Sequence, residues 1–376
     1  MPQNNVSAPK TPELNCLYFY LTSYCNLNCS HCWIAPTYLE KVVAPEEAEF
    51  ALLKEVIDQA LPLGLKSIKI TGGEPFLNEN IGPLIAYAFS KQLSANIETN
   101  ATLIDDAWAE FLKENSVKHI AVSLDGPNST IHEGIRNKPG CFDKAVEGIK
   151  SLKRCGLNVQ IIMSLCGRNL GYLEETLDLA ERYGVDSFKI NCISGIARGK
   201  AFQNQGATLT VKDYLEIHEK IRSTIGPRHK IKILFDIPPA FKPLRDVKNE
   251  AGSCCIKNIL GVLADGSISM CGIGNLLSSL KFGHIRENKL RDLWQENAVL
   301  KIIRDEMPSK FKGICGRCIL KAFCMGKCRA EAYYANNDLL SPFSFCEEAF
   351  KAGLFPQGRL FNNKEDSHGQ PIIPAK

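Results

Sequence analysis

Ten of the sixteen cysteines in this 376-residue chain fall into two groups whose spacing suits the binding of soft metals. Near the N-terminus, Cys25, Cys29 and Cys32 have the spacing C-x3-C-x2-C. The second group lies beyond residue 250 and consists of Cys255, Cys271, Cys315, Cys318, Cys324, Cys328 and Cys346. A [4Fe–4S] cluster normally takes four thiolates, so a loop that supplies three leaves one iron open for chemistry. The first group therefore predicts a catalytic cluster.

Composition limits the classes of protein to which the chain can belong. Hydrophobic residues make up 45% and charged residues 23%, and the net charge of +4 is spread without a long basic run, which argues against a nucleic-acid partner. The first twelve residues are polar and no run of about 18 apolar residues occurs, so we predict no signal peptide and no membrane span. The predicted location is the cytoplasm, where a cysteine-rich chain binds metal more often than it forms disulfides.

Alternating strand and helix patterns from residue 14 to about 215 must position the first cysteine group. Six apolar or β-branched runs predict strands at Leu14–Thr22, Lys66–Thr71, Ala95–Thr99, Lys118–Leu124, Asn158–Leu165 and Ser187–Ile193. Helical patterns occur at Pro45–Leu61, Gly82–Lys91, Asp105–Glu114, Cys141–Cys155 and Tyr172–Tyr183, and a further helix is expected at 211–225. Six β-α repeats predict an α/β fold with a parallel sheet and outer helices, a partial (β/α)6 barrel similar to a TIM barrel. Ligands bind at the C-terminal ends of the strands in such folds.

The chain divides into five predicted segments. An N-terminal extension (1–13) precedes the partial barrel (14–215), and a connecting segment with clustered prolines (216–250) leads to a cysteine-rich domain (251–350) and a tail (351–376). Between 251 and 350 a helix near 290–304 is the main regular element expected. We expect bound metal to stabilise that domain.

The cysteine loop and the motif at the next strand end resemble the radical S-adenosylmethionine (radical SAM) superfamily. The loop follows the first predicted strand, and Gly72, Gly73 and Glu74 follow the second in the sequence T-G-G-E-P. This motif is similar to the family's loop that receives the amino group of the cofactor. Glycines let the backbone approach a ligand closely, and Glu74 offers an anionic acceptor to an ammonium group.

Later strand ends carry residues that the resemblance assigns to the same cofactor. Glu98 and Asn100 match the segment that contacts the ribose. Ser123 and Arg136 match side chains that hold the ribose or the carboxylate, and we expect Arg136 to bind that carboxylate through two parallel hydrogen bonds. Asn191, at the end of the sixth strand, is a candidate for the adenosine side.

The resemblance also implies a mechanism. S-adenosylmethionine binds the open iron of a [4Fe–4S] cluster held by Cys25, Cys29 and Cys32. An electron from a low-potential donor of flavodoxin or ferredoxin type then cleaves the cofactor to a 5′-deoxyadenosyl radical. This radical abstracts a hydrogen atom from the substrate, while the protein positions the reactants and excludes water.

The second cysteine group resembles the seven-cysteine SPASM domain. The resemblance implies two auxiliary [4Fe–4S] clusters. One is held by Cys315, Cys318, Cys324 and Cys346. The other is held by Cys255, Cys271 and Cys328, and its fourth position is either Cys254 or an open site.

Zinc binding is the alternative interpretation of both groups. His31 would then complete a site in the first loop, a pair of structural zinc sites would occupy the second, and the chain would be a scaffold rather than an enzyme. Outside the motifs, Cys16 and Cys192 lie in predicted strands and are candidates for a catalytic thiol or hydrogen-atom donor. The other cysteines are expected to be buried packing residues, namely Cys141, Cys155 and Cys166.

A peptide or protein is the predicted substrate, because relatives with this pair of domains mostly modify ribosomally made peptides. Formylglycine formation is disfavoured, since anaerobic sulfatase maturases carry a catalytic Asp at the position of Gly272. Only 24 residues precede Cys25, too few for a leader-binding domain, so we expect either a separate protein to present the peptide or the barrel mouth and tail to bind it directly. The alternative substrate is a small molecule or cofactor precursor such as a modified tetrapyrrole.

Overall fold

The computed structural model describes residues 11–41, 47–247 and 254–361. Most of the predicted N-terminal extension, the predicted helix start at Pro45, the beginning of the predicted cysteine-rich domain and the end of the tail lie outside these residues. Within the described ranges, every helix is too short or too polar to cross a lipid bilayer.

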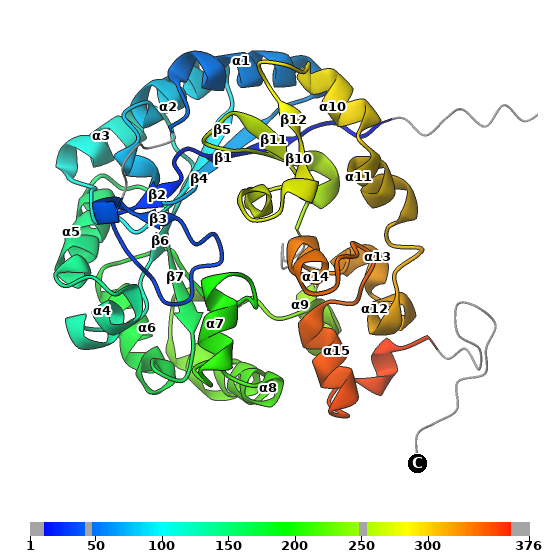
Figure 1. The fold of residues 1–376 in the computed structure, drawn as a ribbon. Helices are drawn as coiled ribbons and strands as arrows, with labels where there is room; N and C mark the ends of the chain where they lie inside the picture. Colours follow the sequence, from blue (N-terminus) through cyan, green and yellow to red (C-terminus); the bar gives the residue numbers. More distant parts are fainter. Residues whose placement is uncertain (1–10, 42–46, 248–253, 362–376) are drawn as a thin grey trace, which may run out of the picture.

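A ten-stranded sheet organises the chain and contains the six predicted strands as consecutive parallel neighbours. These strands are β1 (Cys16–Tyr20), β4 (Ser67–Thr71), β5 (Ser94–Thr99), β6 (His119–Ser123), β7 (Val159–Leu165) and β8 (Ser187–Cys192). The sheet curves, and the connecting helices lie around its outside (Figure 1). The predicted partial barrel is therefore confirmed.

The outer layer contains the predicted helices and two more. The predicted ones are α1 (Phe50–Ala60), α2 (Ile81–Ser90), α3 (Asp106–Glu114), α5 (Cys141–Arg154), α6 (Leu173–Arg182) and α8 (Val211–Lys220). The short helices α4 (Ser129–Arg136) and α7 (Arg198–Asn204) were not predicted. Helix α4 begins after Asn128, whose side chain accepts a hydrogen bond from the Ile131 backbone N–H at 3.1 Å.

Alternation along each strand decides which side chains face the inside of the barrel. In β1, Leu17 and Phe19 are fully buried in the core between the sheet and the helices, whereas Tyr18 between them is partly buried. Lys69 of β4 is the register partner of Tyr18 and shares its face. Polar and aromatic side chains thus line the concave side of the sheet.

The sheet also contains four strands that were not predicted. Strand β9 (Lys232–Phe235) lies beside β8, within the segment expected to be a connection. Strands β10 (Ile259–Val262), β11 (Ser267–Ser269) and β12 (Lys281–His284) continue the sheet beyond β1. Because β10 pairs in parallel with β1, the cysteine-rich region extends the barrel sheet directly. The domain boundaries at 215 and 250 remain predictions.

Short helices and their ends carry five of the seven cysteines of the second group, Cys315, Cys318, Cys324, Cys328 and Cys346. The predicted helix near 290–304 contains α10 (Leu290–Glu296) and α11 (Ala298–Lys301). It is followed by α12 (Gly313–Arg317), α13 (Lys321–Cys324), α14 (Arg329–Asn336) and α15 (Ser344–Lys351), while α9 (Leu244–Val247) precedes β10. Figure 1 shows these helices completing the ring between α8 and α11, and α15 contacts α8.

Candidate active site

The cysteine loop after β1 brings its three thiols together. It contains the short parallel strands β2 (Tyr24–Cys25) and β3 (Thr37–Tyr38). Cys25 and Cys29 are buried and pack with Leu27, while Cys32 packs against this group from a partly buried position. Burial raises the pKa of the Cys25 thiol, and the nearby Glu74 carboxyl and Cys29 thiol raise it further. Metal coordination would provide the missing positive charge, because a coordinating thiol is deprotonated.

Three neighbouring soft donors fit an iron–sulfur cluster with one iron open. In the described part of the chain, no three His, Cys, Asp or Glu side chains are arranged to hold a single metal ion. A cubane cluster is larger than one ion and spaces its thiolates further apart. The loop therefore fits the larger group that its spacing predicts.

Asn100, at the end of β5, forms hydrogen bonds that connect this strand end to the cysteine loop. Its side-chain Nδ2 donates to Asn26 Oδ1 at 2.9 Å and lies 3.9 Å from Cys25 Sγ. Its Oδ1 accepts from the Thr102 backbone N–H at 2.9 Å, and Asn26 Nδ2 donates to Thr102 Oγ1 at 2.8 Å. Asn100 thus positions the residue next to Cys25, and its predicted contact with the ribose remains a prediction.

Close packing explains the two glycines after β4. A Cβ atom on Gly73 would lie 1.7 Å from the carbonyl oxygen of Tyr24, so any side chain there would displace the cysteine loop. Gly72 has a φ of +132°, a conformation that favours glycine. The glycines therefore let the turn after β4 pack directly onto the strand that carries Cys25.

Glu74 is buried beside this turn and binds three protein donors. Its carboxylate accepts hydrogen bonds from Thr99 Oγ1 at 2.6 Å, from the Asn100 N–H at 2.8 Å and from the Phe76 N–H at 3.2 Å. Burial raises the pKa of Glu74 to about 7, although these hydrogen bonds act in the opposite direction. An ammonium group bound nearby would favour the ionised form.

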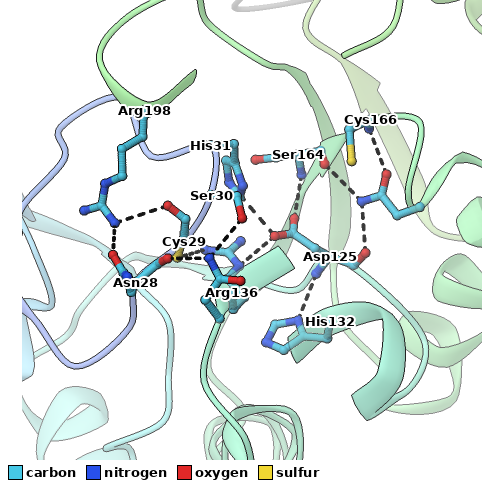
Figure 2. Close-up of polar contacts among 12 residues, drawn as sticks. Asn28, Cys29, Ser30, His31, Asp125, His132, Arg136, Ser164, Cys166 and Arg198 are labelled. Carbon is cyan, nitrogen blue, oxygen red and sulfur yellow. Dashed lines mark hydrogen bonds and ion pairs between the residues drawn. The ribbon is translucent and has the colours of Figure 1, made fainter. Parts of the chain in front are cut away.

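Arg136 joins the cysteine loop to a buried carboxylate that sequence reasoning did not assign to the site. Figure 2 shows the Arg136 guanidinium between Cys29 and Asp125, with Nε 2.6 Å from Asp125 Oδ2 and Nη1 3.6 Å from Cys29 Sγ. Burial would raise the pKa of Asp125, but Arg136 holds it below its ordinary value. The Ser164 N–H donates to Asp125 Oδ1 at 2.8 Å. The predicted two-bond pairing of Arg136 with a cofactor carboxylate would have to share the guanidinium with these partners.

Two histidines flank this pair in neutral form. His31 Nε2 lies 4.0 Å from Asp125 Oδ2, and burial lowers the pKa of His31 to about 4. His132 Nδ1 accepts a hydrogen bond from the Asp125 N–H at 3.1 Å, and burial lowers the pKa of His132 to about 3. At neutral pH, Arg136 is therefore the cation that balances Asp125.

Arg198 holds the opposite side of the cysteine loop and was missed by sequence reasoning. Its Nη1 donates to the Cys29 carbonyl at 3.2 Å (Figure 2). Its Nη2 donates to the Pro36 carbonyl at 2.8 Å. Arg198 is a basic residue at the first position of α7, just after β8. The C-terminal end of β8 lies at the same edge of the sheet as the cysteine loop, so this position could have been singled out from the sequence.

The other predicted cofactor residues lie on the inner face of the sheet. Ser123 is partly buried at the end of β6. Asn191 Oδ1, on β8, is buried and has no hydrogen-bond partner. Glu98 Oε1 lies 2.5 Å from Lys69 Nζ, and although burial opposes ionisation, Lys69 lowers the pKa of Glu98. Their contacts with a cofactor remain predictions.

The second cysteine group separates into two sets in space. Cys315, Cys318, Cys324 and Cys346 line one small, mainly apolar cavity together with Phe311 and Phe355. Four thiols around one apolar cavity fit the predicted four-cysteine cluster.

The remaining cysteines gather near β10. Burial raises the pKa of Cys328 to about 12, and the neighbouring Cys254 thiol contributes to this rise. Burial raises the pKa of Cys271 as well, and the neighbouring thiols of Cys328 and Cys254 raise it further. Cys254 thus lies with Cys271 and Cys328. Cys254 and Cys255 are both electrostatic neighbours of Tyr18, and Cys255 is also a neighbour of Cys16. The role of Cys255 as a cluster ligand remains a prediction. Cys254, which the sequence offered as a possible fourth ligand, lies near Cys271 and Cys328.

Tyr20 occupies the space beside Gly272. A Cβ atom on Gly272 would lie 2.3 Å from the Tyr20 ring, so this position has no room for an acidic side chain. The buried Tyr20 ring therefore fills the space that an Asp side chain at position 272, as in sulfatase maturases, would need.

Comparison with known proteins agrees with this arrangement. The sequence model of the radical SAM superfamily matches residues 19–180, and the model of the SPASM iron–sulfur cluster-binding domain matches residues 254–319. The chain therefore carries a radical SAM domain followed by a C-terminal SPASM domain, and its cofactors are S-adenosylmethionine and iron–sulfur clusters.

Individual relatives act on different kinds of substrate. The chain is 29% identical to the AdoMet-dependent heme synthase of Methanosarcina barkeri, over 87% of this chain and 94% of that protein. It is 26% identical to the PqqA peptide cyclase of Granulibacter bethesdensis, over 85% of this chain and 83% of that protein. Among solved structures, Streptococcus suis SuiB bound to S-adenosylmethionine has a TM-score of 0.69 at 19% identity, covering 90% of this chain and 78% of SuiB. This last likeness shows the fold.

Proposed function

We propose that this chain is a radical SAM enzyme that modifies a tetrapyrrole. The observation that carries the proposal is the similarity over almost the whole chain to AdoMet-dependent heme synthases, including 94% of the length of the Methanosarcina barkeri protein. Two further heme synthases match over 89% of this chain at 26% identity. The small-molecule alternative is therefore better supported than the peptide substrate that the sequence analysis favoured.

We assign the cluster ligands from the cysteine geometry. The catalytic cluster is held by Cys25, Cys29 and Cys32, and the auxiliary clusters by Cys315, Cys318, Cys324 and Cys346 and by Cys271 and Cys328 with Cys254 or Cys255. Bound S-adenosylmethionine and the reduced cluster supply the 5′-deoxyadenosyl radical. The proposed contacts with the cofactor are Gly72, Gly73, Glu74, Glu98, Asn100, Ser123, Arg136 and Asn191.

Glu74 would hold the amino group of S-adenosylmethionine as a carboxylate. The pKa of about 7 means that a substantial fraction of Glu74 is protonated at neutral pH before the cofactor binds. An approaching ammonium group stabilises the ionised form, so Glu74 releases its proton on binding. Thr99 and the Asn100 N–H hold the carboxylate in place while this occurs.

A peptide substrate is the second candidate. It is supported by relatives such as the PqqA peptide cyclase and the subtilosin biosynthesis protein AlbA of Bacillus subtilis, which is 26% identical over 82% of this chain. The Tyr20 ring against Gly272 argues against a sulfatase-maturase type of base at this position. A presenting protein and a flavodoxin or ferredoxin donor remain part of the proposal.

A product assay separates the two candidates. Anaerobically reconstituted enzyme is incubated with dithionite, S-adenosylmethionine and either Fe-coproporphyrin III, the compound in the name of a further relative, or a set of precursor peptides. We expect 5′-deoxyadenosine to form together with a mass change in the porphyrin. A mass change in a peptide, with an unchanged porphyrin, would contradict the proposal.

A further inference from the structure

Five charged side chains of alternating sign line the inside of the barrel, and we call them the luminal charge ladder. They are Lys69 on β4, Glu98 on β5, Lys189 on β8, Asp236 directly after β9, and Lys327 before α14. Lys69 Nζ lies 2.5 Å from Glu98 Oε1, and Lys189 Nζ lies 3.7 Å from Asp236 Oδ2. Lys327 forms an ion pair with the other oxygen of Asp236.

The ladder crosses the interior of the barrel. Strands β5 and β8 are separated by β6 and β7 in the sheet, yet the charge of Lys189 acts on Glu98. Since Phe188 and Ile190 are buried on the helix side of β8, Lys189 faces the opposite, concave side. Glu98 and Lys189 therefore face the same lumen, near enough for their charges to interact.

Four of the five side chains reach solvent, whereas Lys327 is buried, so the ladder as a whole is not part of a sealed core. Lys69 keeps 26% and Lys189 keeps 32% of its side-chain surface exposed. The interior of a closed (β/α)8 barrel is usually filled by branched apolar side chains, so charges at these positions need another explanation. A ligand site is such an explanation, because convergent polar groups in a concave space are typical of ligand sites.

The ladder carries a surplus of positive charge. It contains three ammonium groups and two carboxylates. Glu331, beside Lys327, adds a third carboxyl, and Lys242, which acts on Asp236, adds a fourth ammonium group, so the surplus of positive charge remains. The thiol of Cys254 is an electrostatic neighbour of both Lys69 and Lys327, which places the ladder beside the second cysteine set.

We propose that Lys69 and Lys189 bind carboxylate groups of the substrate, and that Glu98 and Asp236 are their counter-ions when the lumen holds no substrate. This inference rests on the proposed tetrapyrrole function and names what the site recognises, the acidic side chains of the ring. An ammonium is a compact charge on a flexible stem, so a lysine can exchange one carboxylate for another without a fixed fork geometry. The excess of cations over carboxylates favours a polyanionic ligand.

Binding titrations with two forms of one porphyrin test this inference. The reconstituted holoenzyme is titrated with Fe-coproporphyrin III and with its tetramethyl ester, and binding is followed by porphyrin absorbance. We expect the free acid to bind at least about tenfold more tightly than the ester, the scale of a charge-assisted hydrogen bond. Equal affinities for acid and ester would overturn the inference without any variant.

Single substitutions test which ladder residues bind the porphyrin carboxylates. Lys69→Met and Lys189→Met are each expected to weaken binding of the acid about tenfold, with little change for the ester, while Lys189→Arg keeps most of the affinity. Lys113→Met, an exposed position on α3, is the matched control and should change neither. Equal loss of acid and ester binding in Lys189→Met would show a structural role and overturn the inference. If the ladder variants bind normally and the porphyrin is still converted, the ladder inference alone fails; if a peptide is converted instead, the proposed function fails with it.

Discussion

Replacing Asp125 by Asn should strongly destabilise the folded chain. Asp125 is fully buried and its Oδ2 lies 2.6 Å from Arg136 Nε, whose side chain is 8% exposed. Removing one partner of a buried ion pair leaves the other charge uncompensated and typically costs about 3–5 kcal/mol. Asn can still accept the Ser164 N–H with its remaining oxygen, so we expect about 3 kcal/mol, the lower end of that range.

The assay is urea unfolding of matched anaerobic preparations, followed by circular dichroism. Asp106→Asn is the control, because Asp106 and Arg154 form an ion pair that is more than half exposed and worth at most about 1 kcal/mol. The double variant Asp125→Asn/Arg136→Met should recover part of the loss, since it removes the unpaired cation. A loss no larger than that of the Asp106 control would refute the reasoning about this network.

Three further predictions follow from the same geometry. Gly73→Ala should abolish 5′-deoxyadenosine formation and lower the iron content, because its Cβ would lie 1.7 Å from the Tyr24 carbonyl oxygen, whereas Gly134→Ala, with open space around it, should retain both. Gly272→Ala should lower the free energy of unfolding by about 1–3 kcal/mol through overpacking against the Tyr20 ring. In a chain that already carries Tyr20→Ala, adding Gly272→Ala should lower it much less. In cofactor-free protein, the folded state binds the Glu74 proton more tightly than the unfolded state does. The stability that this proton contributes is therefore full below pH 4.5 and is lost as the pH rises through about 7. Between pH 5 and 7, the stability of Glu74→Gln relative to wild type should therefore rise, by at most about 3 kcal/mol, and parallel pH profiles would contradict the pKa of about 7.

The sequence predicted the elements that follow strong local patterns. All six barrel strands and the cysteine loop were found, because long apolar runs and short cysteine spacings carry their own signal. The strand Ile259–Val262 was missed: four residues carry little periodic signal, and their place beside β1 depends on a pairing more than 230 residues distant. Helix α4 was missed for a similar reason, since eight residues give only about two turns.

The partners of the site residues were harder to predict than the residues themselves. Arg136 was singled out from the sequence, but its buried partner Asp125 and its approach to Cys29 depend on how α4 packs beneath the cysteine loop. Arg198 belongs to no motif and reaches the loop from the end of β8. The luminal charge ladder joins four strands or strand ends and one helix start, so its alternation of charge is visible only in the folded partial barrel.

Substrate identity is the central claim, and transfer of isotope tests it most directly. Fe-coproporphyrin III deuterated on its side chains is incubated with reconstituted enzyme, dithionite and S-adenosylmethionine, and the 5′-deoxyadenosine is analysed by mass spectrometry. The proposed function predicts deuterium in the 5′-deoxyadenosine, because the radical takes its hydrogen atom from the porphyrin, and Cys25→Ala should abolish the signal. Unlabelled 5′-deoxyadenosine from the deuterated porphyrin, together with transfer from a labelled peptide, would contradict it.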